Sequence, residues 1–586
     1  MTKLFERLSK GKNMTNNRNS TDSIIDINRK IMLTVMPFWA PLTPPLGISC
    51  LKGFLEMNGY SVKTVDANVV PELWKYHGEY LSVLSKFIDE EKRGNFYMVG
   101  YDVFMNHLMA HINNDDVIKY RDLVKILISK NFFFNIDDEQ TSKLLEVVER
   151  FYESFSAYLD SLLKEEVPAV FGVTVYNSNL APALFAFKFV KERYPDVITI
   201  MGGGVFADQL SIESENLKLF LGKTPYIDKI LIGEGELLLL KLLKGELPDN
   251  KKVYTLNDIN GEYLELSKAN IPDFSDFNLE TYPQLATYTS RSCSYQCSFC
   301  SETVQWGRYR KKNMKQVADE LTMLYEKYGR QLFLLGDSLI NHVVMDLADE
   351  LIKRDLSIYW DAYIRADIPV CDIENTLLWR KAGYYRARMG LESGSQKVLD
   401  LMNKKITPEQ IKAAVSSLAY AGIKTTTYWV LGHPGETEED FQLTLDLVEE
   451  LQDNIYEADF HPFFFYPTGQ VNSGKWSEEN GVTPLYPEDM TNILITQTWE
   501  LNTEPKRETI YKRVQRFAEL CKKCNIPNPY SLKDIYEADE RWKRLHKNAV
   551  PSILEFTKGT YMDENKKLRE FSLVQKFEED DGEFSF

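Results

Sequence analysis

Short apolar runs typical of strands alternate with helical segments through most of this 586-residue chain. In the second half of the chain, six such runs follow one another from about residue 284, with a helix expected after most of them. Consecutive units of this kind form parallel sheets, and six in a row favour a partial (β/α)6 barrel. The expected strands are 285–290, 331–337, 357–364, 384–392, 423–432 and 458–466, and the expected helices are 314–329, 343–354, 372–382, 407–421 and 437–453.

A similar series precedes the barrel and predicts an N-terminal doubly wound, Rossmann-like α/β domain with a parallel sheet. Its strands are expected at 31–37, 61–68, 169–176, 197–204 and 229–236, and its helices at 44–60, 180–194, 206–219 and after 236. We divide the chain into a disordered leader (1–29), the Rossmann-like domain (30–245) with a helical insertion at about 69–167, a linker (246–283), the barrel (284–470) and a mostly helical C-terminal region (471–586).

The composition narrows the class of protein. With 44% hydrophobic and 26% charged residues, the chain has the profile of a packed, soluble enzyme. It contains no run of ~18 or more apolar residues and its first residues are polar, so we expect no membrane span, no secretory signal and a cytoplasmic location. A net charge of -17 disfavours nucleic acid as a partner, because such affinity rests on Lys and Arg neutralising phosphates.

Three of the seven cysteines stand close together, as Cys293, Cys297 and Cys300 in RSCSYQCSFC, directly after the first expected barrel strand. Three thiols can bind three irons of a four-iron four-sulfur cubane and leave the fourth iron open to chelate a small molecule. A structural zinc site normally has four ligands, and no histidine or fourth cysteine stands nearby at ligand spacing. The triad therefore indicates an open [4Fe-4S] cluster as the metal centre.

The triad, with Phe299 before its last cysteine, resembles the cluster motif of the radical S-adenosylmethionine (SAM) superfamily. This resemblance implies that an electron from the cluster cleaves SAM to a 5′-deoxyadenosyl radical. It also implies further SAM contacts after the second, fourth and fifth barrel strands, which are Gly336, Asp337 and Ser338 for the amino group, Glu392 or Ser393 for the ribose, and Gly432, Pro434 and Gly435 behind the adenine. Taken alone, each has an ordinary structural reading, such as a helix start after Gly435 or a surface acid at Glu392.

The domain before the barrel resembles the cobalamin-binding domain of cobalamin-dependent radical SAM enzymes. Glycines at strand ends let a flat macrocycle approach the backbone. A generic doubly wound domain that binds a nucleotide, or nothing, is the alternative. The chain lacks a D-x-H-x-x-G motif, so that histidine does not hold the lower face of a cobalamin. The cofactor-binding glycines implied by the resemblance are Gly202, Gly203, Gly204, Gly233 and Gly235.

Two other groups of residues admit more than one interpretation. His107 and His111 are four residues apart in the insertion, where they are either a metal pair on a helix or ordinary core and surface residues. Cys521 and Cys524 have the spacing of a redox or cluster pair, but two cysteines are too few for an auxiliary cluster, which favours a buried or helix-surface pair. Candidate substrate walls are 306–312 and the aromatic run 460–469.

The resemblance implies methylation of an unactivated carbon of a peptide, natural-product or other small-molecule substrate, with a flavodoxin or ferredoxin as electron donor. A cobalamin-dependent cyclase, oxidase or rearrangement enzyme without methyl transfer is the alternative. A methylthio-transferring enzyme of transfer RNA is disfavoured by the net charge. A cobalamin or cluster sensor would be expected to carry a degenerate SAM site, and the motifs after the barrel strands are intact.

Overall fold

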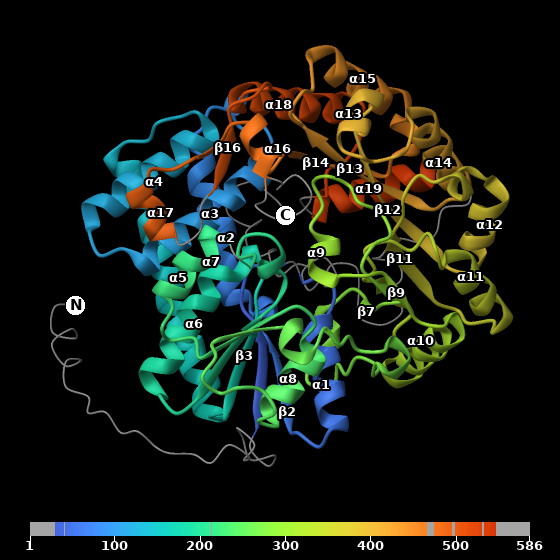
Figure 1. Cartoon of the computed structure of the whole chain (residues 1–586). Helices are drawn as coiled ribbons and strands as arrows, with labels where there is room; N and C mark the ends of the chain where they lie inside the picture. The colour runs from blue at the N-terminus through green and yellow to red at the C-terminus, as the bar shows by residue number, and fades with distance from the viewer. Residues whose placement is uncertain are drawn as a thin grey trace.

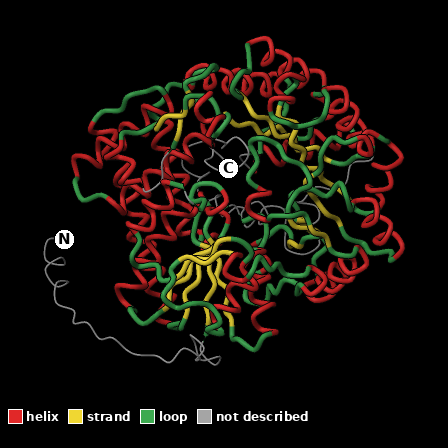
Figure 2. The backbone as a smooth tube through the Cα atoms, in the orientation of Figure 1, coloured by secondary structure: helices red, strands yellow, loops and turns green. Residues whose placement is uncertain are grey.

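The computed structural model describes residues 30–39, 41–212, 214–465, 474–494, 498–529 and 532–546. Two six-stranded parallel sheets form two α/β units side by side, each covered by helices (Figure 1, Figure 2). The α/β fold class expected from the sequence is therefore confirmed. The leader at 1–29 lies outside the described residues. Among the helices within these ranges, none has the length and apolar character that crossing a membrane requires.

The first sheet has the strand order β2-β1-β3-β4-β5-β6, and all neighbouring strands are parallel. The chain adds β2 on one side of β1 and the later strands on the other side. In such sheets, ligands bind outside the carboxyl ends of the strands where the winding reverses, here between β1 and β3. The strands are β1 (Ile31–Val35), β2 (Val62–Asp66), β3 (Val170–Thr174), β4 (Ile198–Gly202), β5 (Lys229–Ile232) and β6 (Val253–Thr255), and the helices are α1 (Leu46–Met57), α6 (Leu180–Arg193), α7 (Glu215–Lys223) and α8 (Gly235–Leu243).

Two elements of this unit differ from the expectation. The strand β6 lies within the expected linker 246–283, because a three-residue run is too short for alternation to reveal it. The helix expected at 206–219 begins only at Glu215, where Ser214 Oγ accepts a hydrogen bond of 3.0 Å from Leu217 N and caps the helix. The residues before this cap include a 3-10 turn at Gly204–Ala207, shortly after β4.

The segment between β2 and β3 folds into four long helices. Its longest helix, α5, begins with a capping box in which Asp137 and Gln140 satisfy each other's backbone N–H groups. Phe38, from the loop after β1, packs against Phe104 with ring centroids 5.1 Å apart, so the insertion shares a core with the first sheet. The helices are α2 (Pro71–Ser85), α3 (Phe96–Asn113), α4 (Val117–Phe132) and α5 (Asp138–Glu165).

The second sheet is the expected partial barrel, with the all-parallel order β14-β13-β12-β11-β10-β7. Apart from α9, which lies on the inner side toward the first sheet, its helices lie on the outer face (Figure 1). The strands are β7 (Leu285–Thr287), β10 (Leu332–Leu335), β11 (Tyr359–Tyr363), β12 (Tyr384–Glu392), β13 (Lys424–Leu431) and β14 (Glu457–Pro462), and the helices are α9 (Glu302–Trp306), α10 (Met314–Tyr328), α11 (Val344–Lys353), α12 (Ile373–Lys381), α13 (Gln396–Leu401), α14 (Pro408–Tyr420) and α15 (Glu438–Glu450). A small antiparallel pair, β8 (Ser290–Arg291) and β9 (Arg310–Lys311), flanks the loop after β7.

The C-terminal region joins the two units. Phe517 of α18 packs into the barrel core, whereas Tyr486 and Leu494 pack into the core of the insertion. A buried ion pair of 2.5 Å between Asp539 of α19 and Lys424 ties the last described helix to β13. The elements are α16 (Gly474–Glu479), α17 (Glu488–Leu494), α18 (Arg507–Lys523), α19 (Leu532–Leu545) and an antiparallel pair, β15 (Val482–Pro484) and β16 (Trp499–Leu501).

Candidate functional site

The three predicted cluster ligands lie on one loop that follows β8 at the carboxyl edge of the barrel sheet. All three cysteines are half-buried, free thiols. Tyr295 N donates a hydrogen bond of 3.5 Å to Cys293 Sγ, and Arg365 Nη1 lies 3.9 Å from Cys297 Sγ. Burial raises the pKa of the Cys300 thiol to about 12. Iron binding at this loop must therefore displace thiol protons.

The donor set of this loop, three thiols, is of the kind that holds an iron–sulfur cluster. Within the described ranges, no group of three or more His, Cys, Asp or Glu side chains is placed to hold one metal ion. A cubane spreads its cysteine ligands over separate corners, so its thiols need not converge on one point. The loop is held from outside, because Ser298 N donates to Met402 O (2.9 Å) and Asn403 Nδ2 donates to Gln296 O (2.6 Å). These two bonds fix the backbone of the loop without using its sulfur atoms.

The segment after β10 supports the cysteine loop as well as lining a cavity. The Asp337 carboxylate is buried and accepts hydrogen bonds from the backbone N (3.0 Å) and hydroxyl (2.7 Å) of Thr289 and from the Ser290 hydroxyl (2.5 Å). These bonds fix the chain just before the cysteines, so Asp337 is engaged within the protein. Its neighbours Gly336 and Ser338 line the cavity described below, and the Ser338 hydroxyl donates to Glu302.

The last residue of β12 takes part in a buried ion pair beside the cysteine loop. Glu392 has a positive φ of 66° and is only 5% exposed, and its Oε1 lies 2.6 Å from Lys404 Nζ. The same ammonium group lies 5.8 Å from the centre of the Phe299 ring. Ser393 is buried and its hydroxyl bonds to the Thr444 hydroxyl at 3.1 Å. Of these two candidate ribose contacts, Glu392 is therefore the one connected to the cysteine loop.

The glycine-proline turn after β13 is backed by helix α18. Gly432 has a φ of +82°, and a Cβ at this position would lie 2.4 Å from the Ile510 side chain. Its N–H donates to Glu436 Oε2 (2.8 Å), and the same oxygen lies 2.7 Å from Arg513 Nη1. Burial raises the pKa of Glu436 to about 7, against the lowering effect of Arg513. Pro434 lies between Gly432 and Gly435. The backbone N–H of Gly435 donates a hydrogen bond to the backbone carbonyl of Glu504, so the C-terminal region fixes this turn.

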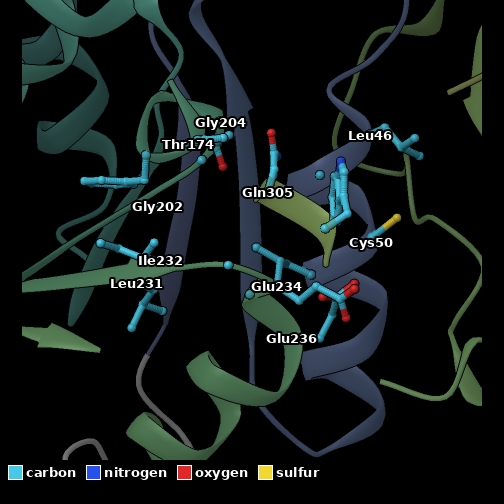
Figure 3. A pocket seen from close by; sticks show the side chains of 18 of the residues that line it. Leu46, Cys50, Thr174, Gly202, Gly204, Leu231, Ile232, Glu234, Glu236 and Gln305 are labelled. Atoms are coloured by element: carbon cyan, nitrogen blue, oxygen red, sulfur yellow. The ribbon is translucent and has the colours of Figure 1, made fainter. Parts of the chain in front are cut away.

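A cavity of about 780 Å³ opens between the first sheet and the barrel (Figure 3). It lies at the carboxyl ends of the strands, where the winding of the first sheet reverses. The first sheet and α1 contribute Thr174, Ile232, Leu46 and Cys50, among others. The predicted cofactor glycines Gly202, Gly203, Gly204, Gly233 and Gly235 all line it, together with Gly336 and Ser338 of the barrel and Trp306 of the proposed substrate wall.

The glycine loop after β4 is shaped by a close approach of two backbones. Gly203 has a φ of +117°, and a Cβ there would lie 2.4 Å from Val175 O. At Gly204 a Cβ would lie 3.0 Å from the Tyr176 ring and 3.6 Å from Gln305 Oε1. Gln305 belongs to α9, the helix that follows the cysteine loop, and reaches into the cavity beside Gly204 in Figure 3. The helix that follows the cysteine loop therefore lies against the glycine loop.

Buried ion pairs at the cavity, which sequence reasoning missed, hold the two units together. Glu234 lies 3.2 Å from Arg291 Nη1 and also pairs with Arg310, and Glu236 pairs with Arg291. The two acids stand beside predicted cofactor glycines at the start of α8, and the two arginines belong to β8 and β9. The two acids are visible in the GEGE sequence of residues 233–236. Their partners, Arg291 and Arg310, lie far away in the sequence, so the ion pairs could not be predicted from it.

The other sequence candidates are core residues. His107 is fully buried between the hydroxyl groups of Tyr80 and Tyr120, each 2.9 Å away, and His111 Nδ1 lies 3.2 Å from the same Tyr120 hydroxyl. Cys521 and Cys524 are buried with the barrel core. Both pairs fit the structural interpretation. Of the aromatic run 460–469, residues 466–469 lie outside the described residues.

Comparison with known sequences places the barrel in a family. Residues 287–448 match the model of the radical SAM superfamily. The chain is 28% identical over 358 residues to an anaerobic magnesium-protoporphyrin IX monomethyl ester cyclase of Rubrivivax gelatinosus, covering 55% of this chain and 62% of the cyclase. It is 26% identical over 407 residues to an uncharacterized methyltransferase of Pyrococcus horikoshii, covering 64% of this chain and 83% of that protein. The match thus spans less than two thirds of the cyclase.

Most of the chain also superposes on a solved structure. The radical SAM methyltransferase TsrM of Kitasatospora setae, with tryptophan substrate and a SAM analogue bound, superposes with a TM-score of 0.56 at 15% identity. The superposition covers 85% of this chain and 89% of that protein. At this level of identity the likeness concerns the fold, and it extends beyond the barrel to the domain in front of it.

Proposed function

We propose, from the premise that this chain belongs to the radical SAM superfamily, that it is a cobalamin-dependent C-methyltransferase of peptide or natural-product substrates. When bound, a reduced [4Fe-4S] cluster supplies the electron that splits SAM, and cobalamin supplies a carrier for a methyl group. The protein binds these groups, orients the substrate and excludes water.

The observation that carries this proposal is the cavity between the two units. Its wall combines the glycines after β4 and β5 with Gly336 and Ser338, which follow β10 of the barrel. A flat macrocycle on the glycine side would therefore face a SAM-binding edge on the other side. The glycines suit a macrocycle because they place no side chains between the backbone and the cavity. At Gly203 a side chain would also collide with the backbone of the loop after β3, at Val175.

Within this site the residues take distinct tasks. Cys293, Cys297 and Cys300 hold the cluster, and Phe299 covers it beside Lys404. Ser338 offers its hydroxyl oxygen, with the neighbouring Glu302 carboxylate, to the amino group of SAM. The Glu392 carboxylate, which its ion pair with Lys404 orients, accepts hydrogen bonds from the ribose hydroxyls. The turn Gly432–Gly435 packs behind the adenine. Asp337 acts indirectly, since it fixes Thr289 and Ser290 ahead of the cysteines.

An aromatic wall favours a small molecule or a peptide side chain as the substrate. Trp39 stacks on Tyr176 with ring centroids 4.0 Å apart, and both line the cavity. Such a wall buries apolar or flat groups. The net charge of -17 argues against a long phosphate backbone as the substrate.

The proposal is tested by anaerobic reconstitution with iron, sulfide and cobalamin, followed by mass spectrometry after addition of SAM and reductant. We expect both 5′-deoxyadenosine and S-adenosylhomocysteine, because methylation consumes SAM in both ways. A Cys297→Ala variant serves as the control that lacks a complete cluster site. A fully loaded wild-type enzyme that forms neither product would refute the catalytic proposal.

A second candidate is a cobalamin-dependent ring-closing or oxidising enzyme, which the similarity to magnesium-protoporphyrin IX monomethyl ester cyclases favours. The same measurement separates the two, because such a reaction yields 5′-deoxyadenosine without S-adenosylhomocysteine. A flavodoxin or ferredoxin is the proposed electron donor in either case. The seven free cysteines suit a reducing compartment, and we propose the cytoplasm.

A further inference from the structure

One buried arginine stands against the cysteine loop with part of its hydrogen-bonding capacity unused. Arg365 follows β11, is 4% exposed, and its Nη1 lies 3.9 Å from Cys297 Sγ. Its Nη2 is buried and has no hydrogen-bond partner among the described residues. A guanidinium group has five N–H donors and cannot lose its charge in a protein. An unpaired donor of this kind in a buried site points to a missing acceptor.

The orientation of Arg365 is fixed by contacts other than the one to Cys297. Its Nε donates to Asp367 Oδ1 (3.0 Å), and its guanidinium group lies 4.0 Å from the centre of the Tyr295 ring. Asp367 Oδ2 in turn accepts from the Tyr295 hydroxyl (2.7 Å) and from Asn341 Nδ2 (3.1 Å). Because Nε is engaged by the Asp367 carboxylate and the Tyr295 ring faces one side of the guanidinium plane, the Nη groups remain to bind sulfur atoms of the cysteine loop.

We infer that Arg365 is the residue that sets the reduction potential of the cluster, through Nη1 on Cys297 Sγ and Nη2 on a second sulfur atom of the cluster. The inference rests on the proposed function, since it presupposes the cluster. Reduction brings one electron from the donor onto the cluster and makes it more negative. A buried cation and N–H bonds to sulfur stabilise that added charge, and so raise the potential. The carboxylate of Asp367 orients Arg365 and offsets part of this effect.

The test is a redox titration of the reconstituted cluster in the absence of SAM, followed by electron paramagnetic resonance. The variants are Arg365→Gln, Arg365→Lys and Asp367→Asn, and the control is Arg354→Gln, which removes an arginine bonded to Asp319 on the barrel surface. At a fixed poise we expect Arg365→Gln to lower the reduced-to-oxidised ratio roughly tenfold, or about 59 mV for one electron. Arg365→Lys falls between wild type and Arg365→Gln, and Arg354→Gln matches wild type.

The Asp367→Asn variant distinguishes an electrostatic effect of Arg365 on the cluster from a purely structural role of Arg365 in supporting the cysteine loop. Loss of this carboxylate leaves the cation less compensated, so the potential should move in the positive direction, opposite to Arg365→Gln. A purely structural role predicts no such opposition. An Arg365→Gln cluster with wild-type potential would overturn the inference, as would shifts of the same sign in both variants. If the Arg365→Gln variant loads no cluster, the other two variants test the inference. It then requires that Arg365→Lys lowers the reduction potential and that Asp367→Asn raises it, and it is overturned if they do not. A wild-type chain that binds no [4Fe-4S] cluster would instead refute the proposed function.

Discussion

Lys404 Nζ lies 2.6 Å from Glu392 Oε1 in a buried ion pair beside the cysteine loop. Because both groups are almost fully buried, the loss of one partner leaves an uncompensated charge. We predict that Lys404→Met lowers the free energy of unfolding by about 3–5 kcal/mol. Chemical denaturation of the apo protein measures this change.

The matched control for that prediction is the double variant Glu392→Gln, Lys404→Met, which removes both charges. It should recover a large part of the lost stability, since no buried charge is left unpaired. Equal losses in the single and double variants would show that packing of the lysine stem, and not its charge, matters at this position.

Gly203→Ala is predicted to weaken cobalamin binding. The positive φ of 117° and the approach of a Cβ to within 2.4 Å of Val175 O force the loop after β4 to move. The strain should cost about 1–3 kcal/mol, and the displaced loop lines the cavity. Spectrophotometric titration with cobalamin measures the affinity. Gly222→Ala is the control, because a Cβ there meets nothing within 4 Å and α7 gains helix propensity. Equal affinities in both variants would contradict the assignment of this cavity.

The turn behind the proposed adenine site depends on Arg513. Its removal leaves the Glu436 carboxyl buried without its cation, which raises the pKa of Glu436 further above its usual range. A neutral Glu436 holds the N–H of Gly432 less firmly. We therefore predict that Arg513→Leu weakens SAM binding roughly tenfold, equivalent to about 1.4 kcal/mol. Arg516→Gln changes an exposed arginine on the same helix and should leave binding unaltered. Isothermal titration calorimetry measures the SAM affinity of both variants. Equal affinities in Arg513→Leu and Arg516→Gln would contradict the role given to Arg513.

Acid should destabilise the helical insertion through its histidines. Burial lowers the pKa of His77 to about 3 and that of His111 to about 4, from an ordinary value of 6.5. The unfolded chain therefore binds more protons than the folded chain once the pH drops below about 6.5, and stability declines toward pH 4. The His111→Gln variant should lose less stability than wild type between pH 7.5 and 4.5. Urea denaturation of wild type and variant across this pH range measures the free energy of unfolding at each pH. The same dependence of this free energy on pH in both proteins would contradict the prediction.

Much of the architecture could be predicted because it depends on local pattern. The strands of both sheets are apolar runs, and the cysteine spacing is visible in the chain itself. The three-residue strand β6 was missed because it is too short to show alternation, and α7 was misplaced because a capping serine, and not hydrophobic periodicity, sets its start.

The parts of the site that escaped prediction depend on contacts between distant segments. Arg365 and Lys404 are unremarkable in the sequence, and only the fold brings both to the cysteine loop. Asp337 lies where the SAM amino group was expected, but its carboxylate is engaged by Thr289 and Ser290. Sequence shows that an acid stands after β10, whereas the partner of that acid is a property of the packed structure.

The central claim is that one chain holds a [4Fe-4S] cluster at the cysteine loop and a cobalamin in the cavity between the two units. The most direct test measures iron and cobalamin in the same reconstituted and desalted sample of wild type. The account predicts about four iron atoms and one cobalamin per chain, with cobalamin retained in a Cys297→Ala variant that has lost its cluster. A wild-type chain that retains the iron but no cobalamin would contradict it.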